Sequence, residues 1–527
     1  MTEIPPARTE TPLAPETRNN QTEVFAVHGA DPEVLAYAMA RYSRSALSMK
    51  ESLREISSQR AEQFLNTFYF QYGHRSIADL AHVAFAVERL SLLAAIVLVD
   101  EQRWDGQERS TRYQNFRKSG WYMPDFGADA ASADLYRETI DRLFAGYHSV
   151  FESIFTSLEG QIAKPEDMKQ ETYERTLKAR AFDVARYLLP LATNTSLGQI
   201  VNARTLETQV SRLLTSPAAE VRQLGVRLQA AATGPAWNVH ADDFAALQHD
   251  IAALDPALGE RAAALLTREV KTAPTLVKYA AVNDYQVRTR EELRQAAAEL
   301  LKGEAIEAAP LVDLIDDADS LETDLATTLL YGQCHYSYRQ IRRHVAALSE
   351  SRRTEIIDLG MRHRGRHDEL LREFSAGQAL RFDILMDIGG FRDMHRHRRC
   401  VQVLQGFTSA HGFAIPEGVP EAGIQTLYEE AMQAAHSTYA TLAAGSAPEA
   451  AESAQYVLPL ATKNRALFKM DFAEALYISE LRSAPQGHFS YRRVAWEMYR
   501  AVERKYPSLA RYFRATDADE PVDLLKR

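Results

Sequence analysis

The chain has 527 residues, of which 46% are hydrophobic and 25% are charged. These values predict a globular protein of two to four domains, and they exclude a collagen, a coiled coil and a mostly disordered chain. The formal net charge of −10 argues against a nucleic-acid-binding surface as the main function. Any site for an anion is therefore expected to be a local basic pocket.

The N-terminal segment, residues 1–21, is rich in Thr, Pro and Glu and lacks the apolar run of a secretory signal, so we expect a disordered tail. The longest apolar run, residues 90–99, is too short for a membrane span, which needs about 20 residues. The two cysteines, Cys334 and Cys400, form no CxxC motif. This usage favours a reducing, cytoplasmic setting without disulfides.

A repeat organises the rest of the chain. Residues 187–193 read YLLPLAT and residues 456–462 read YVLPLAT, so six of seven positions are identical. Similar patterns recur in the same order around both segments. We predict copy one of a domain at residues 22–240, a helical connector rich in Ala and Glu at 241–307, copy two at 308–515 and a tail at 516–527.

Each copy shows the same succession of predicted elements. A helical first third is followed by a short alternating strand, at residues 80–87 in copy one and around Phe382–Leu385 in copy two. A buried helix then spans about Arg89 to Glu101 in copy one, and the LPLAT segment leads to another apolar stretch and a terminal helix. Strands that are not adjacent in sequence predict an α+β domain.

The basic run in copy two, residues 395–399 (HRHRR), is predicted to end a helix. Five neighbouring cationic or titratable groups repel one another unless an anion is close, and arginine suits phosphate. Cations that stabilise a helix C-terminus, or a surface patch, explain the run equally well. Metal binding is disfavoured because His395 and His397 are two residues apart and diverge on a helix.

Three shorter segments carry polar groups suited to ligands. Ser110 and Arg112 alternate along a segment predicted to be extended, so both would face one side and could hold a phosphate. The tripeptide Asn202-Ala203-Arg204 follows the first LPL segment, and Leu481-Arg482 follows the second. Each of these segments, taken alone, is more typical of a structural role.

Together and in this order, the segments resemble the flavin-dependent thymidylate synthases. That family carries R-H-R, S-x-R-Y, A-R-x-V-L-P-L, N-A-R and L-R motifs. The resemblance implies two tandem copies of an α+β fold with helices around a mainly antiparallel sheet. Neither copy holds every motif, and the two copies have lost different ones.

Copy one matches S-x-R-Y at 110–113, the LPL segment at 185–191 and N-A-R at 202–204. Its R-H-R positions hold Asp100, Glu101 and Gln102, and its L-R position holds Leu213. Copy two matches R-H-R at 396–398 and L-R at 481–482. Its S-x-R-Y positions read GFTS (406–409), Gln455 replaces the arginine before the LPL segment, and N-A-R has become residues 471–473, DFA.

These complementary losses imply one composite site between the copies, while the reciprocal site, with Asp100 and Glu101, would be inactive. By resemblance, Arg482 is the catalytic residue and favours negative charge on the pyrimidine. The residues implied for dUMP are Glu108, Ser110, Arg112, Arg186, Arg396 and Arg482. Those implied for FAD are Ser76 in the segment His74-Arg75-Ser76, Asn202, Arg204, Arg396, His397 and Arg398.

The implied reaction is reductive methylation of dUMP to dTMP, with methylenetetrahydrofolate and NADPH as co-substrates and FAD bound. It needs no enzymic nucleophile, which fits the lack of a plausible Cys–His pair. Two alternatives remain open: a related methylase acting on another pyrimidine nucleotide, and a non-catalytic flavin- or nucleotide-binding protein. Members of this family are homotetramers, so by resemblance a chain with two copies is expected to form a homodimer.

Overall fold

The computed structural model describes residues 25, 27, 29–41, 47–55, 75–101, 103–116, 119–283, 287, 310–315, 320–331, 345–361, 374, 380–445 and 449–525. The predicted tail at 1–21, Cys334 and His74 lie outside these ranges. The same holds for most of the second half of the predicted connector, residues 284–309.

Copy one is a three-stranded antiparallel sheet, ordered β1-β3-β2, covered by helices. Its elements run in chain order as α1 (Pro32–Arg41), α2 (Met49–Glu55), the 3-10 helix η2 (Arg75–Leu80), β1 (His82–Ser91), α4 (Leu92–Leu98), β2 (Asp105–Glu108), α5 (Ala130–Gln161), α6 (Gln170–Ala185), η3 (Arg186–Leu188), β3 (Asn194–Asn202), α7 (Ala203–Leu214) and α8 (Ala219–Thr233).

Copy two repeats this succession around a four-stranded sheet, ordered β4-β5-β7-β6. Its elements are β4 (Val312–Ile315), α12 (Leu321–Tyr331), α14 (Glu350–Met361), β5 (Leu380–Asp387), α15 (Ile388–Met394), β6 (Val401–Leu404), α16 (Gln425–Ala443), α17 (Ala450–Ala454), η5 (Gln455–Val457), β7 (Lys463–Met470), α18 (Phe472–Ser483), α19 (Phe489–Lys505) and α20 (Pro507–Ala510). The order β5-β7-β6 repeats β1-β3-β2, so the predicted α+β class and the duplication are confirmed.

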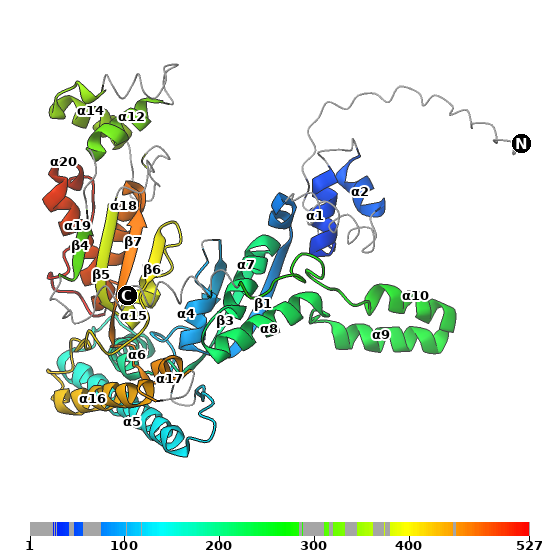
Figure 1. The fold of residues 1–527 in the computed structure, drawn as a ribbon, viewed down its shortest axis with the longest axis horizontal. Coiled ribbons are helices and arrows are strands. Elements are labelled where there is room, and N and C mark those ends of the chain that lie inside the picture. Colours follow the sequence, from blue (N-terminus) through cyan, green and yellow to red (C-terminus); the bar gives the residue numbers. More distant parts are fainter. Residues whose placement is uncertain are drawn as a thin grey trace, which may run out of the picture.

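The two LPLAT segments join the copies by reciprocal backbone hydrogen bonds. Leu191 N donates to Leu458 O and Leu460 N donates to Leu189 O, both at 3.0 Å. The prolines of the two segments also form an antiparallel bridge. Equivalent atoms exchange equivalent bonds, so the copies are related by an approximate two-fold axis at this point. Figure 1 shows the two sheets on either side of this junction, with α5 and α16 side by side beneath it.

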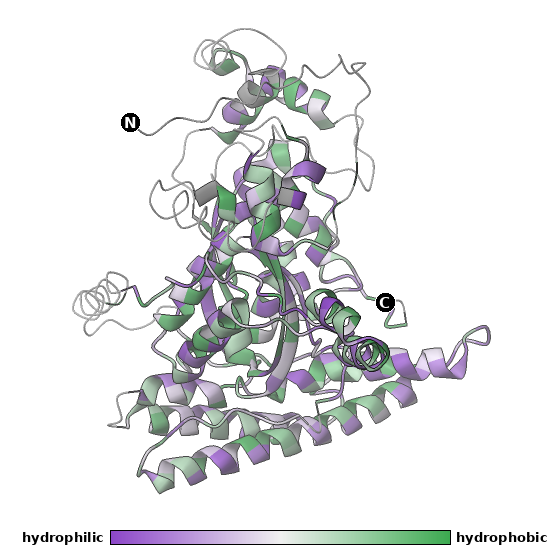
Figure 2. Ribbon diagram, turned by 90° about the vertical axis from the view of Figure 1, so that its right-hand side faces the viewer, coloured by the Kyte–Doolittle hydropathy of each residue, from purple (hydrophilic) through white to green (hydrophobic). Residues whose placement is uncertain are grey.

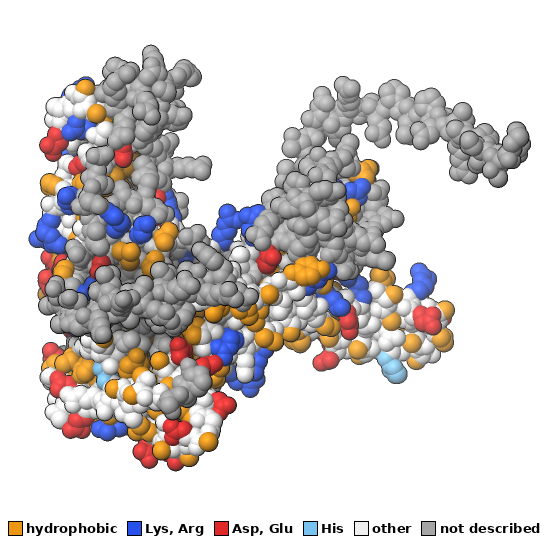
Figure 3. Space-filling model, viewed as in Figure 1, with side chains coloured by type: hydrophobic (Ala, Val, Ile, Leu, Met, Phe, Trp, Pro, Cys, Tyr) orange, Lys and Arg blue, Asp and Glu red, His pale blue; other side chains and the backbone are white. Residues whose placement is uncertain are grey.

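Buried apolar residues of both copies belong to one hydrophobic core, so apolar packing continues through the junction. The helices turn apolar stripes toward this core, and Figure 2 shows hydrophobic and hydrophilic residues alternating along them. Charged side chains of both signs are intermixed over the face drawn in Figure 3. No helix among the described residues is long and apolar enough to cross a membrane.

The first part of the predicted connector is a helical hairpin. It consists of α9 (Ala241–Leu254) and α10 (Pro256–Leu266), which pack against each other and project away from both sheets in Figure 1. Asp255 begins α10, since its carboxylate accepts hydrogen bonds from the backbone of Ala257 and Leu258. The domain limits remain a prediction.

The predicted helix from Arg89 begins too early. Strand β1 continues to Ser91, and Arg89 has a φ of 60°, where the pairing with β3 shifts by one residue. Such a bulge is invisible to periodicity because it depends on the partner strand. Helix α4 begins only at Leu92, where the Ser91 hydroxyl accepts from Ala94 N.

Candidate composite site between the two copies

The S-x-R-Y segment of copy one is a turn, which corrects the predicted extended conformation. Residues 111–113 form the turn, and the Ser110 hydroxyl accepts a hydrogen bond of 3.2 Å from Arg112 N. A serine that bonds the backbone two residues ahead favours a turn over a strand. The Ser110 hydroxyl accepts within this turn and keeps its O–H donor, while the Arg112 side chain points into the protein and is buried.

Arg112 connects the two copies. Its guanidinium donates to both oxygens of Asp183 in copy one, at 2.7 and 3.2 Å, and to the hydroxyl of Tyr491 in copy two at 2.8 Å. Burial alone would lower the pKa of Arg112, but the Asp183 carboxylate raises it above its ordinary value. Arg112 is thus a fixed cation whose position is set from both sides of the junction.

Arg186 forms a second link between the copies. It begins η3, is 2% exposed, and donates to Thr111 at 3.3 Å and to Asp393 of copy two at 3.1 Å. Burial would raise the pKa of Asp393, but Arg186 and Arg112 lower it, so Asp393 is a carboxylate. The Nε atom of Arg186 is buried and has no hydrogen-bond partner among the described residues.

A third link joins Glu108 to Arg392. Glu108 ends β2 and pairs with Arg392 of α15, and both side chains are nearly buried. Arg392 lies one helical turn before the R-H-R triad, so this pair fixes the end of α15 against copy one. Four residues implied for dUMP, Glu108, Ser110, Arg112 and Arg186, are therefore gathered at the junction.

The R-H-R triad follows α15 directly. The helix starts where the Asp387 carboxylate accepts from Gly390 N, and it ends at Met394. Within the described residues, the exposed Arg396 guanidinium makes no hydrogen bond or ion pair, whereas Arg398 lies 4.3 Å from the ring centre of Trp104 in copy one. Burial lowers the pKa of Arg398, and the neighbouring Arg396 lowers it further.

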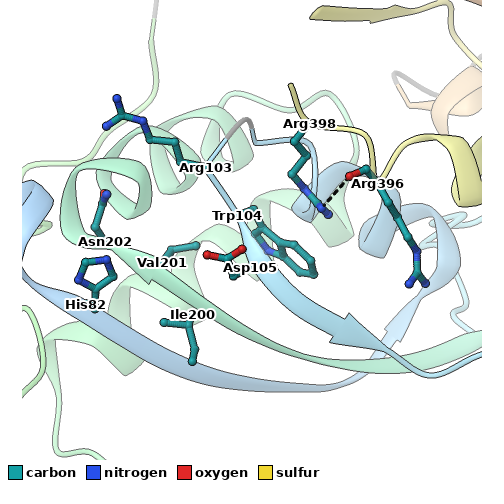
Figure 4. A pocket seen from close by; sticks show the side chains of 9 residues that line it. All are labelled: His82, Arg103, Trp104, Asp105, Ile200, Val201, Asn202, Arg396 and Arg398. Carbon is teal, nitrogen blue, oxygen red and sulfur yellow. Dashed lines mark hydrogen bonds between the residues drawn. The ribbon is translucent and has the colours of Figure 1, made fainter. Parts of the chain in front are cut away.

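Arg396 and Arg398 open onto a cavity of about 470 Å³ whose other walls come from copy one. Figure 4 shows Arg396 and Arg398 at one side of the cavity, with the indole ring of Trp104 between them and the sheet. The ring is held because Trp104 Nε1 donates to Gln199 at 2.7 Å. The cavity is lined by His82, Arg103, Trp104, Asp105, Ile200, Val201, Asn202, Arg396 and Arg398.

Asn202 lines this cavity, and Arg204 does not. Asn202 ends β3 and caps α7 by accepting from Thr205 N at 2.8 Å, so part of its role is structural. Arg204 pairs with Asp79, which also contacts Arg103. The side chain of Ser76, in η2, lies outside the described residues. In copy two, Asp471 caps α18 at the position of Asn202 and pairs with Arg399.

His397 and Arg482 contact each other instead of lining the cavity. Arg482 Nε donates to His397 Nε2 at 2.7 Å, and His397 Nδ1 lies 3.3 Å from Glu474. The Arg482 guanidinium also lies 5.5 Å from the ring centre of Tyr491, whose hydroxyl binds Arg112. Tyr491 therefore places the S-x-R-Y arginine of copy one and the L-R arginine of copy two around one ring.

The acidic positions of copy one face the basic triad. Glu101 is paired with Arg212 at 2.8 Å, and Asp100 Oδ1 lies 3.7 Å from His395 Nε2. Burial raises the pKa of Glu101, and Arg212 opposes this effect. Both acids line a smaller cavity of about 220 Å³, together with Arg398. Where copy two has cationic groups, copy one therefore has two acids, Asp100 and Glu101, which face basic side chains.

Cys400 has no features of a nucleophile. Its thiol is buried and donates to His397 O, and burial raises its pKa to about 12. Among the described residues, no group of three or more His, Cys, Asp and Glu side chains is arranged to hold a metal ion.

Sequence reasoning missed four residues at the junction: Asp183, Arg392, Trp104 and Tyr491. Asp183 precedes Arg186 by three residues on the same helical surface, and Arg392 precedes Arg396 by four, so helical spacing could have indicated both. Nothing in the sequence marks Trp104 or Tyr491, because each meets its arginine across the junction between the copies.

Comparison with known proteins supports the repeat. A family model described as thymidylate synthase complementing protein matches residues 26–231 and again residues 316–508. A UPF0159 protein of Chlamydia muridarum is 28% identical over 543 residues, covering 95% of this chain and 93% of that protein. A UPF0159 protein of Thermoplasma acidophilum is 25% identical over 523 residues, covering 92% of this chain and 95% of that protein.

A flavin-dependent thymidylate synthase of Clostridium tetani is 25% identical over 177 residues, which cover 33% of this chain and 67% of that protein. A match to one third of the chain is what a relative with one copy of the domain would give. The family model matches both copies over most of the chain, and the folds of the copies repeat one another. The chain therefore belongs to the family of thymidylate synthase complementing proteins, the flavin-dependent thymidylate synthases, as a tandem member with two copies of the domain.

Proposed function

We propose that the chain catalyses FAD-dependent reductive methylation of dUMP to dTMP at one composite site, with methylenetetrahydrofolate and NADPH as co-substrates. The observation that supports this most directly is the shared cavity: Asn202 of copy one and Arg396 and Arg398 of copy two line the same space. Each copy supplies motif residues that the other has lost.

The residues present suit a dinucleotide. Arg396 and Arg398 offer two cations, and the buried Nε atom of Arg398 has no partner among the described residues, which fits an anionic group such as a pyrophosphate. Trp104 and Ile200 give the cavity an apolar wall. When bound, the flavin would supply the hydride chemistry, and the protein would bind, orient and neutralise charge.

For the nucleotide, the proposed residues surround Tyr491 and Asp393. Arg112 and Arg186 are held as fixed cations whose charge attracts a phosphate, and the buried Nε atom of Arg186 has no hydrogen-bond partner among the described residues. Arg482 would hold the pyrimidine and stabilise negative charge that develops on it. Glu108 and Arg396 complete the proposed set of dUMP-binding residues at the junction.

A flavin assay tests the proposal. Purified protein should be yellow, and Arg398→Ala should lose most of its flavin because a cation that lines the cavity is removed. Arg399→Ala is the matched control, since Arg399 is half exposed and pairs with Asp471 instead. Wild-type flavin stoichiometry in Arg398→Ala would contradict the composite site.

A methylase with a different pyrimidine nucleotide is the second candidate. Asp393 is a largely buried carboxylate paired with Arg186, and it can accept N–H or O–H donors of a ligand. Expression in a thymidine auxotroph separates the two. Growth without thymidine supports the synthase, whereas no growth from a protein that retains flavin supports another substrate.

A further inference from the structure

The imidazole of His397 is held from both sides by residues of α18. Nε2 accepts a hydrogen bond of 2.7 Å from Arg482, and Nδ1 lies 3.3 Å from Glu474 Oε1. The side chains of His397 and Glu474 are 5% and 7% exposed. Because a guanidinium only donates, Nε2 is the unprotonated nitrogen, so the proton lies on Nδ1, which faces the Glu474 carboxylate.

The backbone around His397 is equally constrained. His397 N donates to Met394 O, and the His397 carbonyl accepts from Gln402 at 2.9 Å and from the Cys400 thiol at 2.8 Å. At the other end, Glu474 is fixed because Asp471 accepts from its backbone N–H at 2.9 Å. The carboxylate, the imidazole and the guanidinium therefore form a pre-organised row.

This row exists in only one copy. The α7 helix of copy one aligns with α18, so Thr205 stands at the position of Glu474 and Leu213 at that of Arg482. Glu101 stands at the position of His397 and pairs with Arg212. All three members are absent together from copy one, which is expected if they work as one unit.

We propose that Glu474 and His397 are positioning residues that orient Arg482 toward the oxygen-bearing edge of a pyrimidine nucleotide. Nε of Arg482 donates to His397, and the guanidinium lies 5.5 Å from the centre of the Tyr491 ring. Its two terminal nitrogens can therefore donate to the ligand. The identity of that ligand rests on the proposed function. His397 then orients an arginine instead of binding a flavin phosphate, the role that the resemblance implies.

The row depends on His397 being neutral. Burial lowers the pKa of His397, and Arg482 and Arg398 lower it further, while Glu474 opposes them. Protonation at Nε2 would remove the lone pair that Arg482 uses. Nucleotide affinity should therefore fall at acid pH, and Glu474→Gln should move this fall to lower pH because it removes the charge that favours the imidazolium.

Nucleotide titration of the flavin-loaded, full-length protein tests the row. Glu474→Ala should weaken dUMP binding at least about tenfold, or about 1.4 kcal/mol, while flavin content stays at the wild-type level. Glu474→Gln should weaken it less, because its amide oxygen still accepts from Nδ1. Glu430→Gln, at an exposed acid on α16, is the control. Unchanged dUMP affinity in Glu474→Ala, or loss of flavin in parallel with dUMP, would overturn the proposal.

A second measurement needs no ligand. In ¹⁵N-histidine-labelled protein, the signals assigned to His397 by comparison with His397→Asn should show a neutral ring protonated at Nδ1. A ring protonated at Nε2 would overturn the row whatever the ligand. If wild-type protein binds no dUMP, the proposed function fails. The protonated nitrogen of His397 then decides by itself whether Glu474, His397 and Arg482 are arranged as proposed.

Discussion

Arg112 and Asp183 show how a buried ion pair limits substitution at the junction. Their side chains are 10% and 6% exposed, so removing one charge leaves the other buried and unpaired. Asp183→Asn should lower the free energy of unfolding by about 3 kcal/mol. Denaturant titration followed by fluorescence measures this, with the exposed Asp134→Asn as control, which should change stability by less than about 0.5 kcal/mol.

His488 should make stability depend on pH. It is fully buried beside Arg186 and Arg112, and burial and these arginines hold its pKa well below the ordinary value of 6.5. The unfolded chain takes up this proton near pH 6.5 and the folded chain does not. Stability is therefore complete at neutral pH and is lost as the pH falls below about 6.5, by up to about 1.4 kcal/mol per pH unit.

Thermal unfolding between pH 7 and pH 5 checks this slope. His488→Asn keeps an acceptor for Ser490 N, the bond that starts α19, but it cannot titrate. Its melting temperature should fall less steeply with pH than that of the wild type, whereas the exposed His240→Asn should not change the slope. Equal slopes in wild type and His488→Asn would contradict the assignment.

The motif residues could be predicted from the sequence, but their contacts could not. The resemblance implied one site for Arg112, Arg396 and Arg482. The structure brings Arg112 and Arg482 to the same ring, while Arg396 lies at the cavity. The Ser110 hydroxyl accepts from Arg112 of its own motif, and His397 contacts Arg482 of another motif and Glu474, which no motif includes. Whether a serine bonds the backbone of its own turn depends on local geometry, which composition does not contain.

At the scale of elements, α4 and α15 each begin at a pair of one acid and one hydroxyl, and the two groups have exchanged positions between the copies. Ser91 donates to Glu220 at 2.6 Å, and Tyr456 of the other copy donates to the same carboxylate at 2.9 Å. At the equivalent place in copy two, the acid is Asp387 and the hydroxyl is Ser490. Tyr187 of copy one lies beside that pair, and burial and Asp387 raise its pKa.

The swap predicts a double-mutant result. Ser91→Asp alone sets two carboxylates together in a buried place, and Glu220→Ser alone leaves Tyr456 without its acceptor, so each should lower the melting temperature. The double variant restores one acid and one hydroxyl, as in copy two. It should be more stable than Ser91→Asp by at least about 1 kcal/mol; strict additivity of the two losses would contradict the equivalence.

The elements themselves were largely predictable because each copy supports the assignment of the other. Alternating residues predicted β5, and the structure places that strand at Leu380–Asp387. The limits of α4 were not predictable, because a bulge at Arg89 extends β1 by pairing with β3. Likewise, β2 and β6 have four residues each, too few for a periodic signal.

At the scale of the whole molecule, we propose a homodimer of two-copy chains. The reason is numerical: a pair of such chains contains four copies of the domain, the number in the family's homotetramers that the resemblance implies. Light scattering coupled to gel filtration should give twice 59.2 kDa. A particle of one chain mass at micromolar concentration, with flavin bound, would show that two copies suffice.

The approximate two-fold axis at the LPLAT junction has a consequence for how this chain can evolve. In a dimer of identical subunits, each contact across the axis is made twice by the same two residues. Fusion of the copies lifts this constraint, because each side of the axis is encoded separately. Glu108 can then face Arg392, and Asp100 can face His395. The same freedom that lets one half lose a motif lets the other half gain a counter-charge, so the two halves have become complementary instead of interchangeable.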